Sequence, residues 1–317
     1  MPPSLQSPLA FATRYAGLFR VQMRMATLAA MQYRVDFVVR GLIAVLWSAL
    51  TLIPLVVVFG VQLRMSALSA MQYRVDFLVR GLIAFLWSAI TLIPILVVYG
   101  VRKEVAGWSY GEALVVVGWF TLLRAVLEGA VSPSLTAVVE HVRKGTLDFV
   151  LLKPADAQFL VSTAKFEPWR IVDAVAAVVV FCYAFTKMGH WPSIAQVATG
   201  LVFLALAVVI LYSIWILVVS AAFWVVKVDN LSYLFGSLFD VGRWPIDVLR
   251  GVWRGTLMMV FTFVFPVALM TTYPALALLG RLDAKTAALA LGGGVLFAVI
   301  ARRVWRRALA MYTSASS

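Results

Sequence analysis

Apolar runs long enough to cross a lipid bilayer recur along this chain, and they constrain its fold more than any other feature. Uncharged stretches at about 197–226 and 286–301 each end directly before a basic residue, Lys227 or Arg302. A helix satisfies its own backbone hydrogen bonds in lipid and needs about 20 apolar residues to span the hydrocarbon core. Because 63% of the residues are hydrophobic and 13% are charged, the chain has more apolar side chains than a soluble core of its size needs. We predict an all-α polytopic membrane protein.

The formal net charge of +13 does not indicate a nucleic-acid partner. The basic residues are scattered at the ends of apolar runs, whereas a nucleic-acid-binding module gathers them on one surface. Lys- and Arg-rich cytoplasmic loops and contact with anionic lipids explain them, at about 1 kcal/mol for each side chain near the membrane surface. The single cysteine, Cys182, excludes a disulfide framework, and His141 and His190 lack a second metal ligand at motif spacing. We therefore expect the lipid bilayer as a partner, with no nucleic acid and no directly bound metal or cofactor.

Residues 21–60 and 61–100 are copies of one another, and 30 of the 40 positions are identical. Each copy joins an amphipathic lead to an uncharged apolar run that ends at Gly60 or Gly100. This pattern predicts one surface helix and one span in each copy. Two same-sense copies in series must cross the bilayer in opposite directions unless one of them does not fully span, and the sequence leaves both arrangements open.

The leads mark where the chain approaches the membrane. An N-terminal amphipathic surface helix is predicted over residues 1–35. Tyr73, Arg74 and Asp76 belong to the lead of the second copy and precede its span.

Five further spans are predicted, at about 113–131, 171–186, 197–226, 255–279 and 286–301. The fourth contains Pro266 and Pro274, so it is expected to be kinked or partly re-entrant. A second surface helix is expected over 230–254. Counted from the second copy, six spans place 13 Lys and Arg residues in the segments on one side of the membrane and 5 in those on the other. The positive-inside tendency puts the more basic side, with the C-terminal tail, in the cytoplasm.

Two charged residues, Arg124 and Glu128, lie four positions apart in the span predicted at 113–131. A lone charge at the bilayer centre costs about 2.5–3.5 kcal/mol on insertion scales, so the pair is expected to lie in the interior or close to an interface. Asp173, near the start of the next span, is a candidate partner for Arg124 or Arg170. Arg124, Glu128 and Asp173 are the candidate translocation path. A pair that only neutralises itself near the cytoplasmic end is the commoner arrangement, and the sequence does not decide between the two.

A polar segment, residues 141–154, separates two apolar regions and ends at a proline. Thr146 can cap a short helix in it, on which Leu147, Leu151 and Leu152 would share one face. Such a helix would lie flat on the membrane surface and offer a ridge to a partner. An ordinary charged loop is the commoner meaning of this spacing, so the residues alone leave both interpretations open.

Several motifs resemble the ABC-2 family of ABC transporter permeases, in particular the branch in which two related permeases serve one ATPase. They are the Tyr-Arg-Val-Asp-Phe lead at 73–77, the Gly107-Trp108-Ser109 loop with Glu112, the stretch Val142–Pro154, the Pro266 and Thr272-Tyr273-Pro274-Ala275 segment, and the tail Tyr312–Ser317. The stretch Val142–Pro154 is fairly specific, and the others are individually weak. Together they cover about residues 61–317. The extra copy at 21–60 departs from the family, whose members have one such lead and six spans.

The resemblance implies half of an exporter in a bacterial cytoplasmic membrane, with a cytoplasmic C-terminus. Residues 61–317 would form a six-span ABC-2 helical bundle with cytoplasmic surface and coupling helices, extended by one duplicated N-terminal apolar segment. No Gly-x-x-x-x-Gly-Lys-Ser/Thr loop occurs in the chain, so ATP and Mg²⁺ are expected on a separate ABC ATPase subunit. A second permease chain, identical or related, would complete the path.

The resemblance also assigns a role to the polar segment, as the site where the ATPase docks. The residues implied to couple the two subunits are Arg143, Lys144, Gly145, Thr146, Leu147, Asp148, Phe149, Leu151 and Pro154. Leu147, Phe149 and Leu151 would supply the buried contacts, and the charged residues would set the register.

Other function classes make different demands on the sequence. An ion-coupled secondary transporter would show inverted repeats with buried acidic residues at matching positions, whereas this repeat is direct. A membrane-embedded lipid-modifying enzyme would need a convergent cluster of His, Asp, Glu or Cys, and the sequence shows none. The sequence does not exclude a passive scaffold. The interior offers aromatic and apolar surface with few charges, which favours an amphiphilic or hydrophobic substrate, such as a drug, a natural product or a lipid. We therefore expect a permease subunit that is not itself an enzyme.

Overall fold

The computed structural model describes residues 20–21, 24–25, 34–72, 74–153, 156–224 and 235–312. The chain divides into two compact units, Met1–Val61 (unit 1) and Gln62–Ser317 (unit 2). Most of the surface helix predicted over 1–35 lies outside the described residues, as do Tyr73 and Pro154.

Helix α2 (Arg34–Gln72) supplies most of the described structure of unit 1 and continues into the first residues of unit 2. The helix does not end with the first copy at Gly60 but runs through this glycine and through most of the lead of the second copy. A glycine costs a helix only about 1 kcal/mol relative to alanine, and good helix formers such as Gln62 and Leu63 follow it. The stretch of α2 that is apolar enough to span a bilayer, Leu52–Ser69, therefore crosses the boundary between the copies.

Unit 2 is a bundle of helices with one short β-hairpin. Its elements in chain order are α3 (Arg74–Val101), β1 (Glu104–Val105), β2 (Trp108–Ser109), α4 (Tyr110–Val126), the π-helical turn η1 (Leu127–Val131), α5 (Ser132–Lys144), α6 (Asp148–Leu151), α7 (Ala157–Ser162), η2 (Pro168–Arg170), α8 (Ile171–Met188), α9 (Ile194–Ser220), η3 (Ala221–Phe223), η4 (Asp240–Arg243), η5 (Ile246–Gly255), α11 (Thr256–Met259), the π-helical turn η6 (Val260–Val264), α12 (Val267–Met270), α13 (Thr272–Leu278) and α14 (Ala284–Ala310).

Six helices in the described part of the chain are long and apolar enough to cross a membrane, and a bent pair brings the number to as many as seven. One of the six is the stretch in α2, and the other five are α3, α4 continued through α5, η2 with α8, α9 with η3, and α14. The prediction of an all-α polytopic membrane protein is confirmed. The chain is a multi-pass membrane protein.

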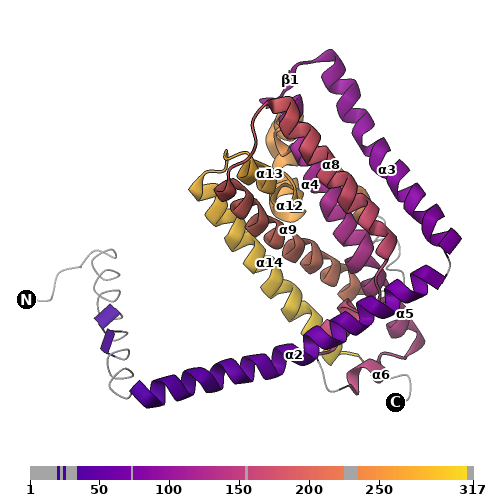
Figure 1. Cartoon of the computed structure of the whole chain (residues 1–317), viewed down its shortest axis with the longest axis vertical. Helices are drawn as coiled ribbons and strands as arrows, with labels where there is room; N and C mark the ends of the chain where they lie inside the picture. The colour runs from indigo at the N-terminus through magenta and orange to yellow at the C-terminus, as the bar shows by residue number, and fades with distance from the viewer. Residues whose placement is uncertain are drawn as a thin grey trace, which may run out of the picture. The chain divides into compact units, whose positions relative to one another are not determined.

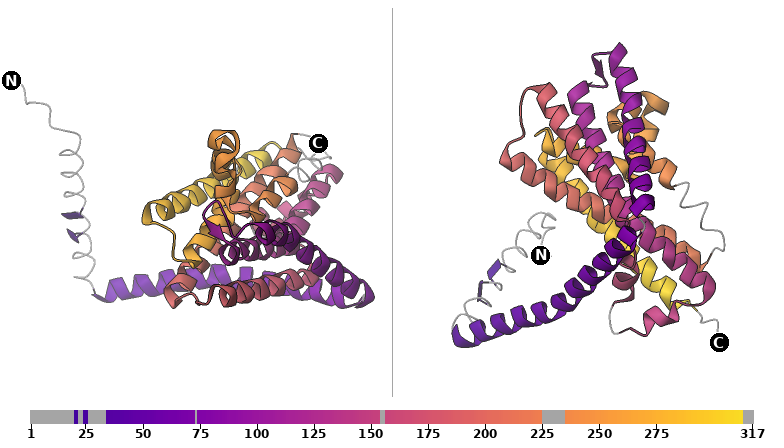
Figure 2. Two further views of the ribbon diagram at one scale, coloured as in Figure 1. Left: turned by 90° about the horizontal axis from the view of Figure 1, so that it is seen from above. Right: turned by 45° about the vertical axis from the view of Figure 1, so that its right-hand side comes forward.

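Helix α4 is the centre of unit 2, because twelve of its 17 residues are buried. It packs against α8 and α3 on one side and against α13 and η4 on the other, while α14 packs along α9 (Figures 1 and 2). The β-hairpin lies at one end of unit 2, and α6 lies at the opposite end (Figure 1). We call these the hairpin end and the α6 end.

The hairpin leads the chain from α3 into α4. Ala106 and Gly107 make its turn with φ values of 52° and 83°, as a two-residue type I′ turn requires. Ser109 then caps α4: its backbone N–H donates to Glu112 Oε2 at 2.8 Å, and its hydroxyl accepts from the Glu112 N–H at 3.4 Å. This reciprocal capping satisfies two helix-end donors and fixes the start of the central helix.

The surface helix predicted over 230–254 is wrong for the described residues, 235–254. Phe239 stacks on Phe120 of α4 with the ring centroids 5.1 Å apart, and Asp247 accepts a hydrogen bond from Trp108 at the hairpin end. Phe235, Phe239 and Ile246 are each less than 5% exposed. This part of the chain therefore packs into the bundle through Phe235, Phe239 and Ile246, where we expected a helix on the membrane surface.

The kink predicted in the span at 255–279 is present. The helical segments Thr256–Val264 and Val267–Leu278 meet at an angle of 64°, and Pro266 lies at the break because it cannot donate the backbone hydrogen bond that would continue the first segment. Asp247, before this pair, and Arg281, after it, both contact residues at the hairpin end. The chain between these two contacts thus enters the bundle and returns to the same end.

The contact between α4 and α8 depends on the absence of a side chain at Gly118. A Cβ at this position would lie 2.7 Å from the Phe181 ring, whereas one at Gly292 of α14 would have no atom within 4 Å. Gly118→Val is expected to destabilise the folded protein by about 1–3 kcal/mol, because overpacking forces the two helices apart. Thermal unfolding in detergent measures this. The matched variant Gly292→Val should unfold close to the wild type, and equal effects of the two variants would contradict the packing argument.

Candidate functional site

The described part of the polar segment, residues 141–153, lies at the α6 end of unit 2. Gly145 ends α5 in the left-handed conformation, with φ 65° and ψ 21°, so the chain turns sharply after Lys144. The Thr146 hydroxyl lies 2.8 Å from His141 Nδ1, while α6 begins at Asp148 without a side-chain cap. The predicted capping role of Thr146 is wrong because its hydroxyl pairs with the histidine of the preceding helix instead.

The apolar residues of this segment lie in two different environments. Leu147 is fully buried, whereas Leu151, Phe149 and Leu152 are 41%, 70% and 81% exposed. Because α6 has only one turn, Leu147 packs into the core while the residues after it reach solvent. The predicted common face of Leu147, Leu151 and Leu152 is therefore wrong, and Leu147 is not accessible to a partner. It anchors the segment, and Phe149 and Leu152 form its exposed apolar surface.

A polar network joins the chain after α6 to two long helices. Asp156 caps α7 by accepting from the Phe159 N–H at 3.0 Å, and its carboxylate lies 2.6 Å from Arg302 Nη2 of α14. Arg302 also donates to Gln158, which donates to the Tyr212 hydroxyl of α9 at 2.9 Å. The hydrogen bond from Arg302 holds the pKa of Asp156 below its ordinary value of 3.8.

Sequence reasoning missed this network. Arg302 was recognised only as part of a basic tail, and its partner Asp156 lies 146 positions away. No local spacing connects them, so only the packing of α14 beside α9 and α7 reveals the contact.

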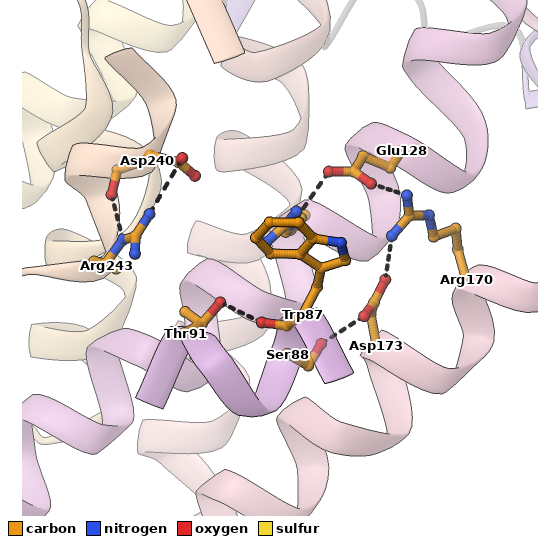
Figure 3. A network of polar contacts seen from close by, with 9 residues as sticks. Trp87, Ser88, Thr91, Glu128, Arg170, Asp173, Asp240 and Arg243 are labelled. Atoms are coloured by element: carbon orange, nitrogen blue, oxygen red, sulfur yellow. Dashed lines mark hydrogen bonds and ion pairs between the residues drawn. The ribbon is translucent and has the colours of Figure 1, made fainter. Parts of the chain in front are cut away.

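A row of charges crosses from α4 to α8 (Figure 3). Glu128 lies 2.8 Å from Arg124 Nε and also pairs with Arg170. Arg170 Nη1 lies 3.1 Å from Asp173, which accepts a further hydrogen bond of 2.5 Å from Ser88 of α3. Two arginines and two carboxylates therefore balance one another. Asp173 partners Arg170 and not Arg124, the other candidate.

These charges border a cleft of about 740 Å³. Its walls include Arg124, Glu128 and Arg170, together with Lys165, Glu167 and Asp240. Burial raises the pKa of Glu167 above its ordinary value. The cleft thus presents groups of both signs next to apolar side chains, an arrangement suited to the polar part of an amphiphilic molecule. Asp173 is only 1% exposed, so it positions Arg170 and does not line the cleft.

The lead residues of the second copy lie at the start of α3. Asp76 Oδ2 is 2.7 Å from Arg80 Nε, and both side chains are about half exposed. The Arg80 guanidinium lies 5.1 Å from the centre of the Trp169 ring. Arg74 is exposed, so in the described structure the lead has a solvent-facing or lipid-facing surface.

The motif residues at the hairpin end have long-range partners that spacing did not predict. Trp108 Nε1 donates to Asp247 Oδ2 at 3.0 Å, and Glu112 pairs with Arg281 at 2.6 Å. Arg281 also lies over the Trp108 ring, 5.3 Å from its centre. The hairpin therefore holds both flanks of the bent helix pair.

Comparison with known families identifies the chain. A family model described as an ABC-2 family transporter protein matches residues 85–316. The chain belongs to the ABC-2 transporter family. No curated protein and no solved structure matches it. As an ABC-2 family member with several apolar spans, the chain is a membrane permease of an ABC transporter, and its family works with an ABC ATPase.

The charges around Glu128 give a first prediction for the permease. Glu128→Ala leaves Arg124 and Arg170 facing each other, and it is expected to lower the free energy of unfolding by about 1–3 kcal/mol, the cost of leaving a partly buried charge unpaired. Thermal unfolding in detergent is the measurement. Asp76→Ala removes a half-exposed pair, worth no more than about 1 kcal/mol, and serves as the control. An effect of Glu128→Ala no larger than that of the control would show that the row of charges does not hold α4 and α8 together.

The Asp156–Arg302 pair predicts a pH dependence. Since the pKa of Asp156 is lower in the folded state, the pair stabilises the fold above the ordinary Asp value of 3.8 and loses this contribution as the pH falls through the lower folded pKa. Wild type should exceed Asp156→Asn in stability at pH 6 by up to about 1 kcal/mol, because the pair is half exposed. Unfolding midpoints of the two proteins should converge below pH 4. A difference that persists unchanged in acid would contradict the assignment.

Proposed function

We propose that this chain is the permease subunit of an ATP-driven exporter whose separate ABC ATPase docks on α6. The observation that carries the proposal is the division of the polar segment into a buried anchor, Leu147, and an exposed apolar surface, Phe149 and Leu152. A few side chains that become fully buried on binding carry most of the energy of a protein–protein contact, and Phe149 and Leu152 are available for such a contact. ATP and Mg²⁺ would bind to the ATPase subunit. The described part of this chain contributes the docking surface.

The contacts behind α6 support a mechanical role. A displacement of α6 would pass to α7, which it contacts, and from α7 to α14 and α9 through Asp156, Gln158 and Arg302. These side chains join three elements by hydrogen bonds of fixed geometry, so the elements would move together as a rigid body. Closure of two ATPase subunits beneath two permease chains, identical or related, would in this way tilt the long helices and alternate the access to a central path.

The α6 end would face the cytoplasm of a bacterial cell, with the C-terminus on the same side. The basic residues that end α14, Arg302, Arg303, Arg306 and Arg307, lie at this end and fit the positive-inside tendency. The hairpin end would then face outward.

The substrate would be amphiphilic or hydrophobic, such as a drug, a natural product or a lipid. The cleft beside Glu128 supports this, because it combines charged groups of both signs with apolar walls. Arg124 and Glu128 line it and are the residues expected to meet the polar part of the substrate. Asp173 would act indirectly, by holding Arg170.

Docking on α6 predicts different effects for two neighbouring apolar residues. Phe149→Ala should reduce binding of the cognate ATPase and uncouple ATP hydrolysis from transport, while leaving permease stability unchanged, because this side chain is exposed. Leu147→Ala should lower permease stability by about 2–5 kcal/mol, as core truncations of leucine do. Co-purification with the ATPase, transport in proteoliposomes and thermal unfolding of the permease alone measure the three properties.

The double variant Asp148→Ala/Phe149→Ala is the stronger form of this test. Transport that survives it, with unaltered ATPase binding, would contradict docking on α6. Leu152→Ser, which changes the other exposed apolar residue, should give an effect of the same kind as Phe149→Ala.

A further inference from the structure

A long apolar groove runs between α9 and α14, two helices that lie side by side in every view (Figures 1 and 2). Its volume is about 640 Å³. Val202, Leu206 and Val209 line it on α9, and Leu291, Val295 and Val299 line it on α14. Charge enters the lining at one end only, where Arg302 and Arg303 border the groove.

The groove follows from how closely the two helices approach. A Cβ on Gly294 would lie 2.2 Å from Leu206 Cδ1, so a side chain here would force Leu206 to move. The small residues Ala205 and Ala298 also line the groove and leave space between the helices. Close approach at small residues is the common packing mode of helices in membranes. The groove beside the contact of Gly294 with Leu206 is open to lipid, because both helices are spans at the surface of the bundle and Val202 and Val295 are exposed.

The length of the groove matches one leaflet of a bilayer. Leu291 and Arg302 are separated by eleven residues of α14, which corresponds to about 16 Å at about 1.5 Å per residue. The hydrocarbon core of a bilayer is about 30 Å thick, so one leaflet contributes about 15 Å. An extended acyl chain in the groove would therefore reach from the arginines to near the bilayer centre.

The two arginines at the end of the groove differ in their contacts. Arg302 pairs with Asp156, which lies outside the groove lining. Arg303 forms no ion pair within the described part of the chain. The groove therefore ends at an arginine with no acidic partner there, directly after the apolar run of α14. Basic pockets between spans are characteristic sites for anionic lipid head groups.

We propose that the α9–α14 groove binds an anionic phospholipid, with one acyl chain along Val202–Val209 of α9 and the phosphate on Arg303. The lipid binds from the leaflet that contains the basic end of α14. This inference rests on the membrane location of the chain and not on docking of an ATPase, so it stands or falls separately from the proposed function.

Native mass spectrometry of the purified permease in dodecyl maltoside tests the proposal. The probes are 1-palmitoyl-2-oleoyl phosphatidylglycerol and phosphatidylcholine, which share their acyl chains and differ in head-group charge. We expect one phosphatidylglycerol to bind at least about five-fold more tightly than phosphatidylcholine. Arg303→Gln should weaken phosphatidylglycerol binding about five-fold, the factor that about 1 kcal/mol for one basic side chain gives. It should weaken phosphatidylcholine binding less, because the choline cation offsets the charge of the phosphate. Arg303→Lys should retain the preference.

Two further variants separate the groove from a diffuse basic surface. Arg307→Gln removes an exposed arginine that does not line the groove, and it should change binding by less than two-fold, roughly within the noise of such a measurement. Ala298→Phe should fill the groove and weaken the binding of both lipids. Equal losses from Arg303→Gln and Arg307→Gln, equal affinity for the two lipids, or unchanged binding to Ala298→Phe would each overturn the proposal and leave annular lipid only.

Discussion

A charged side chain inside a membrane-spanning bundle needs a partner of opposite charge, since neither lipid nor an apolar core solvates it. Much of unit 2 depends on this constraint. Glu128 lies between Arg124 and Arg170, and Arg170 lies between Glu128 and Asp173, which fixes α4 and α8 in one register. The hydrogen bond from Ser88 to Asp173 adds α3 to the same point. Three spans thus meet where their charges balance, and the cleft opens beside that fixed point.

The fold was predictable where a local pattern has one meaning. Apolar runs of span length predicted α8, α9 and α14, because no other environment in an aqueous cell buries so many consecutive apolar residues. The pattern at 230–254 has two meanings, since helical apolar spacing serves equally at a membrane surface and inside a bundle. Phe235, Phe239 and Ile246 are buried against the rest of the bundle, and only these tertiary contacts, such as those of Phe239 with Phe120 and of Phe235 with Trp215, decide between the two.

The candidate site divides in the same way. Arg124 and Glu128 were predictable as a pair because four residues place them on one face of a helix. The contacts of Asp156 with Arg302 and of Ser88 with Asp173 join residues 146 and 85 positions apart, and no spacing rule reaches that far. Leu147 shows that a local spacing rule can also predict a contact face that does not form. Its sequence position suggested a face shared with Leu151, yet a one-turn helix next to the core buries one of them and exposes the other.

The two copies of the repeat also show that a local pattern does not determine tertiary contacts, because they have nearly the same sequence and different environments. On α3, Gly81, Ala84, Ser88, Thr91 and Ile95 are buried in one stripe at spacings of three and four. In the first copy the matching residues Gly41, Ala44 and Ser48 are exposed.

Ser88 reaches Asp173, whereas Ser48 donates to the carbonyl of Ala44 in its own helix at 2.8 Å. The stripe makes a helix suitable for packing against α8. In the second copy, the hairpin connects this helix directly to the central helix α4 and limits how far α3 can lie from α8. Position in the chain therefore determines the structural role of a sequence that occurs twice.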